Sequence, residues 1–247
     1  MKLAVFDFDS TLMEGETLEF IAREYNIEPL MKEITTAAME GEIDFFESLT
    51  QRVALLKGAK ESKVIEICEN LPYTKGAKET ITELHKMGYK VVCFSGGYHT
   101  ATIPAQNVLG YDAQFANILH FKNGEMTGLV GGEMMFSDSK GKMLKRLQAL
   151  LNVSKEDTMT VGDGANDLSM FAHAGKRVAF CAKPIVKENA NIIIENKDLT
   201  EILKFLLWYK HVKKINYNYI RERKHTNIIL NNLSLNWSNI HLLFVDI

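Results

Sequence analysis

LAVFDFDSTL, residues 3–12, is the stretch that decides the fold. Its apolar run begins at Leu3 and leads directly into two acidic residues, Asp7 and Asp9, which are one position apart. A short, continuous apolar run is typical of a strand that is buried on both faces of a sheet. A carboxylate at the end of such a strand is costly unless a partner offsets its charge. The stretch therefore predicts a buried strand that brings two carboxylates to a site where their charge is used.

The composition of the whole chain excludes several classes of protein. The 247 residues are 46% hydrophobic and 24% charged with a net charge of −2, which favours neither nucleic acid nor an anionic membrane as a partner. No stretch approaches the roughly 18 apolar residues of a membrane span, and the N-terminal sequence does not resemble a signal peptide. Cys68, Cys93 and Cys181 form no CxxC pair, which fits a reducing compartment. We therefore expect a cytoplasmic protein.

Strand and helix patterns alternate along most of the chain. Between the strand patterns lie helical ones, such as residues 77–88 and 139–151, so we expect an α/β fold with a parallel sheet covered by helices on both faces. Ligands of such sheets bind beyond the carboxyl ends of the strands, where Asp7, Ser95 and Asp163 should meet. The strand patterns are residues 3–8, 89–94, 158–161, 177–180 and 191–195.

Two segments depart from this alternation. Residues 14–74 contain four successive helical patterns without a strand, which predicts a helical insert that lies over the strand ends as a lid. Residues 116–136 form a second irregular piece, in which Asn123-Gly124 between two β-like runs indicates a hairpin.

The C-terminal segment, residues 209–247, differs in composition from the rest of the chain. It has six lysines and arginines against two acidic residues, seven asparagines, and neither glycine nor proline. Its positive charge and Trp237 would suit docking to a partner or a membrane surface. We interpret the segment instead as an accessory extension that is not a second catalytic domain.

Two acidic loops indicate a metal site. A calcium-binding loop is excluded at Asp7 and Asp9, because Thr11, Leu12 and Leu18 stand where such a loop needs ligands and a glycine. The second loop, VGDGANDL at 161–168, superficially matches a dinucleotide fingerprint, but Asp167 replaces its third glycine. Two loops rich in carboxylates favour a hard divalent cation with oxygen ligands, most simply Mg²⁺. The histidines show no ligand spacing, and we assign no role to His85, His99, His120 or His173.

Other strand ends offer groups that bind anions. Ser95 and Gly96 follow the second predicted strand, and a hydroxyl with an open backbone N–H suits a phosphate. Lys140 and Lys142 begin the helix before the next strand, and either could complete an anion clamp.

Four motifs in this order resemble the haloacid dehalogenase superfamily of Mg²⁺-dependent aspartyl-phosphate phosphatases. They are DFDST from residue 7, SGG from 95, SKGKML from 139 and GDGAND from 162. The resemblance covers about residues 1–207. Within that superfamily, the chain most resembles the phosphoserine phosphatases. It implies a Rossmann-like catalytic core of residues 1–13 and 75–208, a helical cap of residues 14–74 that sets specificity, and an extension of residues 209–247.

The resemblance also implies a role for each motif residue. Asp7 would be the nucleophile and Asp9 the general acid, and both would bind Mg²⁺ together with Asp163. Asp167 would orient the groups around the metal. The expected phosphate-binding residues are Ser95, Gly96, Asn166 and Lys140, which family spacing favours over Lys142.

On the cap, the resemblance implies the substrate. Glu16 would face the ammonium of O-phospho-L-serine, Arg52 its carboxylate, and Met39 and Phe45 would form an apolar wall. The expected enzyme is a phosphoric monoester hydrolase, a monomer or homodimer, that performs the last step of L-serine biosynthesis without nucleic-acid or membrane partners. The alternative is the same chemistry on another small phosphomonoester, or transfer of the phosphoryl group to homoserine. A regulatory protein without catalysis is disfavoured, because every catalytic position is filled.

Overall fold

The computed structural model describes residues 1–39 and 42–207. Residues 1–205 form one compact unit. Within the described ranges, no helix is long and apolar enough to cross a membrane. The extension of residues 209–247, which composition sets apart, lies outside the described residues.

The described residues contain a seven-stranded sheet in the order β4-β3-β2-β1-β5-β6-β7. All neighbouring pairs are parallel except the hairpin of β3 and β4. The expected α/β sheet and its five predicted strands are therefore confirmed, and the sheet gains an antiparallel edge. The strands are β1 (Lys2–Phe6), β2 (Tyr89–Tyr98), β3 (Ala113–Lys122), β4 (Glu125–Gly132), β5 (Thr158–Gly162), β6 (Lys176–Phe180) and β7 (Ile192–Ile194).

The predicted hairpin turn is present at Asn123-Gly124. Both residues have positive φ, +54° and +79°, as a two-residue turn between twisted strands requires. Residues 116–136, the second irregular piece of the sequence, contain most of β3 and all of β4, and β3 pairs with β2, which brings the hairpin into the main sheet.

The strand order places β1 at a topological switch point. The chain runs from β1 to β2 and β3 on one side, and later returns to β5 on the other side of β1. The backbone N–H of Asp7, just after β1, donates to the Val161 carbonyl of β5 at 2.9 Å. The loops after β1 and β5 therefore diverge from adjacent strand ends, which is where such sheets bind ligands.

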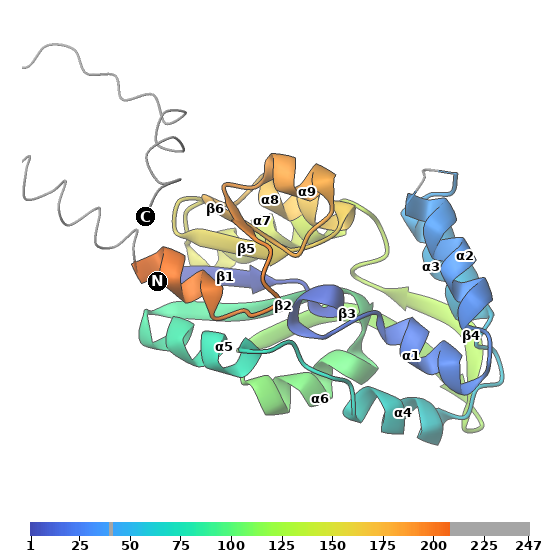
Figure 1. Cartoon of the computed structure of the whole chain (residues 1–247). Helices are drawn as coiled ribbons and strands as arrows, with labels where there is room; N and C mark the ends of the chain where they lie inside the picture. The colour runs from blue at the N-terminus through green and yellow to red at the C-terminus, as the bar shows by residue number, and fades with distance from the viewer. Residues whose placement is uncertain (40–41, 208–247) are drawn as a thin grey trace, which may run out of the picture. The chain divides into compact units, whose positions relative to one another are not determined.

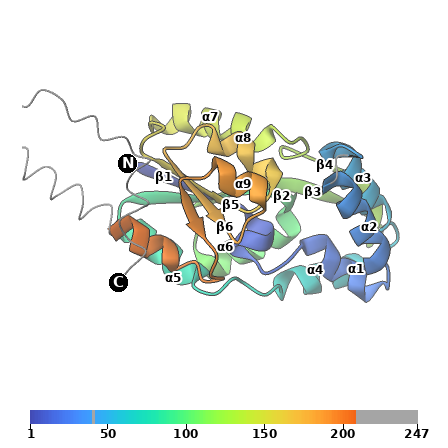
Figure 2. The same cartoon turned by 45° about the horizontal axis from the view of Figure 1, so that its top comes forward.

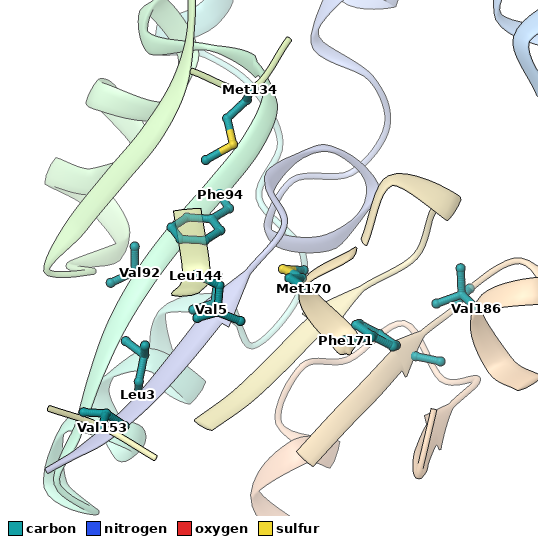
Figure 3. Packing of buried hydrophobic residues seen from close by; sticks show 12 residues of the cluster. Leu3, Val5, Val92, Phe94, Met134, Leu144, Val153, Met170, Phe171 and Val186 are labelled. Carbon is teal, nitrogen blue, oxygen red and sulfur yellow. The ribbon is translucent and has the colours of Figure 1, made fainter. Parts of the chain in front are cut away.

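Helices cover both faces of the sheet (Figures 1 and 2). One face carries α5 (Ala77–Lys86) and α6 (His99–Leu109), and the other carries α7 (Ser139–Leu151), α8 (Leu168–Phe171) and α9 (Pro184–Asn189). Alternate residues of the central strands reach the core on the α7 side. Figure 3 shows part of this core, which includes Leu3, Val5, Val92, Phe94, Leu144, Met170, Phe171 and Val186. Truncating a fully buried leucine there, such as Leu144, is expected to cost about 2–5 kcal/mol.

The segment after β1 is helical, as expected. It contains α1 (Thr17–Glu24), α2 (Glu28–Met39), α3 (Phe45–Ala54) and α4 (Glu61–Glu69), with no strand among its described residues. These helices lie beyond the end of the sheet to which β1 points (Figures 1 and 2). The start of α3 is fixed by its N-cap, because the Asp44 side chain accepts from the backbone N–H of Glu47 at 2.7 Å.

The turn between α3 and α4 is attached to the β3–β4 hairpin. The backbone N–H of Gly58 donates to the carbonyl of Met126, and the N–H of Met126 donates to the carbonyl of Ala59, both at 2.8 Å. The N–H of Glu61 donates to the carbonyl of Gly124 at 2.8 Å. The helical segment is thus joined to the sheet by its chain connections and also through this edge.

Candidate active site

Asp7 lies at the centre of the site, directly after β1 and only 4% exposed. Its Oδ1 accepts from the backbone N–H of Phe8 at 2.7 Å and is 2.6 Å from Lys140 Nζ. The same Nζ donates to Asp167 Oδ1 at 2.6 Å. Burial alone would lower the pKa of Lys140, but Asp167 and Asp7 together raise it well above its usual range, so this lysine stays charged.

The structure distinguishes the two candidate lysines at the start of α7. Lys140 is buried against the two aspartates, whereas Lys142 pairs with Asp138 at 2.6 Å on the surface. Of these two lysines, Lys140 is therefore the one in place to hold an anion at Asp7.

The loop after β5 carries the other two carboxylates. Asp167 is fully buried, and its Oδ2 accepts from the backbone N–H groups of Asp163 at 3.0 Å and Gly164 at 3.1 Å. A Cβ at Gly162 would lie 2.2 Å from Asp167 Oδ2, so the close approach of this carboxylate requires glycine there. Three donors hold Asp167, which suits it to fix the loop and Lys140.

The carboxylates of Asp7, Asp163 and Asp167 converge. One oxygen from each lies within 4.8 Å of the others. Burial, together with the charge of Asp167, raises the pKa of Asp7 well above its usual range and that of Asp163 to about 7. Lys140 supplies one positive charge beside three carboxyl groups, so the cluster lacks positive charge. Hard oxygen donors that lack a counter-charge fit a divalent cation such as Mg²⁺.

Asp9 faces the helical segment. Its Oδ1 accepts from the backbone N–H of Thr17 at 2.7 Å and from the Thr17 hydroxyl at 2.6 Å. A Cβ at Gly97 would lie 2.6 Å from Asp9 Oδ2, so the opposite side of the carboxylate also has a fixed boundary. Burial raises the pKa of Asp9, and the hydrogen bonds from Thr17 partly offset this. The side chains of Asp7 and Asp9 thus have different environments.

The end of β2 supplies the next group of predicted residues. β2 continues to Tyr98, beyond the predicted end at residue 94, and Ser95 is fully buried in it. The Ser95 Oγ accepts from the backbone N–H of Gly97 at 2.8 Å. A Cβ at Gly96 would lie 3.1 Å from the Phe45 ring, so glycine lets the helical segment approach this strand end.

A cavity of about 350 Å³ lies between the strand ends and the helical segment. Its volume is that of a site for a small molecule. Ser95, Lys140 and Asp167 are buried residues outside its lining. Met39 is the last residue of α2, and its side chain lies outside the described part of the chain. The predicted residues that line the cavity are Asp7, Asp9, Glu16, Phe45, Arg52, Gly96, Asp163 and Asn166.

Glu16 and Arg52 bring a carboxyl group and a guanidinium to the cavity from the helical segment. Glu16 precedes α1 and accepts from the Ser10 hydroxyl at 3.0 Å. Burial, and then the neighbouring Asp9, raise the pKa of Glu16 to about 8. Arg52, on the last turn of α3, donates from Nε to the Ser48 carbonyl at 3.3 Å and lowers the pKa of Asp9 and Glu16 electrostatically.

Sequence reasoning missed several residues of the site. Thr17 holds Asp9 across a separation of eight residues, and Ser10 holds Glu16, neither of which a linear motif reveals. Gly97 belongs to the SGG motif, where its closeness to Asp9 could not be foreseen. The cavity lining also contains Lys183, which no motif indicated.

With this geometry established, the chain can be compared with known proteins. A family model for haloacid dehalogenase-like hydrolases matches residues 1–175. A phosphoserine phosphatase of Wolinella succinogenes is 61% identical over 206 residues, which are 83% of this chain and 100% of that protein. The chain belongs to the haloacid dehalogenase-like hydrolases, among the phosphoserine phosphatases. The resemblance inferred from the four motifs is thereby confirmed.

Solved structures of phosphoserine phosphatases have the same fold. A phospho-aspartyl intermediate analogue of one is 48% identical with a TM-score of 0.79, and covers 83% of this chain and 98% of that chain. A substrate-bound complex is also 48% identical with a TM-score of 0.79, and covers 83% of this chain and 97% of that chain.

Proposed function

We propose that this chain hydrolyses O-phospho-L-serine to serine and phosphate through an aspartyl-phosphate at Asp7, with Mg²⁺ as cofactor. One observation supports this proposal most strongly. Asp7 and Asp163 line the strand-end side of the cavity, where Lys140 is buried against Asp7, and the carboxyl group of Glu16 and the guanidinium of Arg52 line the opposite side. These two sides match the phosphate end and the amino-acid end of phosphoserine.

Asp7 attacks phosphorus in the first step. Phe8 N–H and Lys140 hold its Oδ1, which orients the carboxylate and presents Oδ2 to the substrate. The new bond joins this oxygen to phosphorus, and the bond from phosphorus to the serine oxygen breaks. A difficult hydrolysis is thus divided into two displacements.

Asp9 is the general acid in the first step and the general base in the second. It gives a proton to the departing serine oxygen, and then takes one from the water that releases phosphate and regenerates Asp7. Thr17 and Gly97 fix its carboxylate on two sides, which suits a group that must meet one atom of the substrate.

The phosphoryl oxygens need positioned positive charge and donors. Lys140 and Ser95 are buried just outside the cavity lining, whereas Gly96, with its backbone N–H, and Asn166, with its amide, line the cavity. Mg²⁺ would be held by Asp7, Asp163 and the Asp9 carbonyl, and when bound it supplies charge that offsets the phosphoryl group. Asp167 steadies Lys140 and the loop that carries Asp163.

We assign substrate choice to a cap of residues 14–74 above a core of residues 1–13 and 75–208. Glu16 meets the substrate ammonium, Arg52 meets its carboxylate, and Phe45 forms an apolar wall. Glu16, Arg52 and Phe45 all line the cavity, which supports this division. Serine as product would make the reaction the last step of L-serine biosynthesis. The free cysteines are consistent with our assignment to the cytoplasm.

Release of phosphate and serine from O-phospho-L-serine, with and without Mg²⁺, tests the proposed function. Equal amounts of both products, with little release when Mg²⁺ is chelated, are expected. A parallel reaction with homoserine present detects transfer to an alcohol. A folded sample that releases no phosphate, or that forms phosphohomoserine in place of free phosphate, would overturn the proposal.

A further inference from the structure

Residues 9–17 form a loop that is closed by hydrogen bonds between its ends. The backbone N–H of Ser10 donates to the Gly15 carbonyl at 2.8 Å, and Thr17 donates twice to Asp9. The Ser10 hydroxyl donates to Glu16 Oε1 at 3.0 Å. Glu16 is therefore fixed relative to Asp9 through several short contacts within one loop.

Ser10 occupies a backbone conformation that favours glycine. Its φ of +56° lies in the left-handed region, where a residue with a Cβ is strained and glycine is not. Serine here therefore has a backbone cost that glycine would avoid, and its hydroxyl is the group that glycine lacks. That hydroxyl binds Glu16.

We propose that Ser10 is a positioning residue for substrate specificity, whose hydroxyl holds the Glu16 carboxylate where it meets the ammonium of phosphoserine. The inference rests on the proposed function. Ser10 is outside the cavity lining, whereas Glu16 lines it, so the hydroxyl acts on the substrate through Glu16.

The chemistry of the substrate explains why this spacing matters. In phosphoserine two carbon atoms separate the ester oxygen from the nitrogen, so the two atoms remain a short distance apart in any conformer. Asp9 must reach the oxygen while Glu16 reaches the nitrogen. The loop that fixes Glu16 relative to Asp9 sets this distance, and it disfavours phosphate esters that lack the ammonium.

Two substitutions separate the hydroxyl from the backbone. Ser10→Gly removes the hydroxyl and the strain, and Ser10→Ala removes the hydroxyl and keeps the strain. The substrates are O-phospho-L-serine and the phosphate ester of 3-hydroxypropanoic acid, which keeps the carboxylate and lacks the ammonium. In both variants we expect the ratio of kcat/KM for the first substrate over the second to fall about tenfold, mainly through KM for phosphoserine.

The Glu16→Gln variant supplies the control. In that background Ser10→Gly should change the ratio less than twofold, because the charge that the hydroxyl positions is gone. The thermal midpoint of Ser10→Gly should equal or exceed that of the wild type, which shows that the loss is not unfolding. An unchanged ratio in Ser10→Gly, or a fall in Ser10→Ala alone, overturns the inference. Wild-type protein inactive on phosphoserine would instead contradict the proposed function.

Discussion

The strand ends and the helical segment face each other across one cavity, but they are built differently. At the strand ends, Asp7, Lys140 and Asp167 are almost fully buried and joined by 2.6 Å ion pairs. On the helical side, Glu16 and Arg52 are half-buried, and their neighbours are hydroxyl and carbonyl groups.

This difference separates two requirements of the enzyme. Phosphoryl transfer needs charges that are already in place, because reorganising them during the reaction would raise the barrier. Substrate selection needs groups that the substrate can reach and that are held where its charged ends arrive. Changes at the strand ends should therefore abolish turnover of all substrates, whereas changes on the helical side should alter preference among substrates.

The largest effect is expected for Asp7→Asn. The amide cannot form the aspartyl-phosphate, so kcat for phosphoserine should fall by about 10³-fold or more. Stopped assays of phosphate release measure the loss, and circular dichroism checks the fold. If the variant keeps more than a tenth of wild-type kcat, Asp7 is not the nucleophile.

Next in size is Lys140→Met, which leaves two buried carboxylates without their cation. We expect kcat to fall by about 10²-fold or more for every phosphate ester, with a loss of about 3–5 kcal/mol in the free energy of unfolding. Lys142→Met is the matched control, because Lys142 pairs at the surface and should change stability by less than about 0.5 kcal/mol. Equal effects of the two substitutions would contradict the assignment.

A smaller and more selective effect is expected for Arg52→Ala. Loss of the guanidinium should lower kcat/KM for phosphoserine by about 30- to 100-fold, and much less for phosphoethanolamine, which has no carboxylate. Arg23→Ala, on the exposed surface of α1, is the control and should change neither value. A similar loss of kcat/KM on both substrates would mean that Arg52 does not bind the substrate carboxylate.

The smallest expected effect is the change of the thermal midpoint with pH and with removal of the metal. Burial raises the pKa of Asp163 from 3.8 to about 7 in the folded protein. The contribution of this group to the free energy of unfolding is therefore fully present below pH 4, and it is lost as the pH rises through 7. The thermal midpoint of metal-free protein should therefore fall between pH 5 and 8. Mg²⁺ should raise the midpoint more at pH 8 than at pH 5, because its ligands must be deprotonated. A metal-independent midpoint that rises with pH would contradict this account.

The sequence predicted those parts of the molecule that depend on local patterns. Buried strands followed by Asp7 and Asp163 identified the edge of the sheet, because parallel strands must present their carboxyl ends together. Lys140 and Lys142 could not be separated by pattern, since two positions on a helix point about 200° apart and only packing decides which faces inward. Family resemblance favoured Lys140, and the structure places it at Asp7.

Features that depend on long-range pairing or backbone geometry could not be predicted. Asn123-Gly124 indicated a hairpin, but pairing of β3 with β2 depends on residues far along the chain. The positive φ of Ser10 and the bonds from Thr17 to Asp9 arise only once the turn after β1 is formed.

The central claim is that the strand ends perform the chemistry and the helical segment selects phosphoserine. Its most direct test compares wild-type kcat/KM for O-phospho-L-serine, phosphoethanolamine and the phosphate ester of 3-hydroxypropanoic acid in the presence of Mg²⁺. We predict that phosphoserine is preferred by about 10²-fold or more over each ester that lacks one of its charged groups. Equal values for the three substrates would contradict the claim.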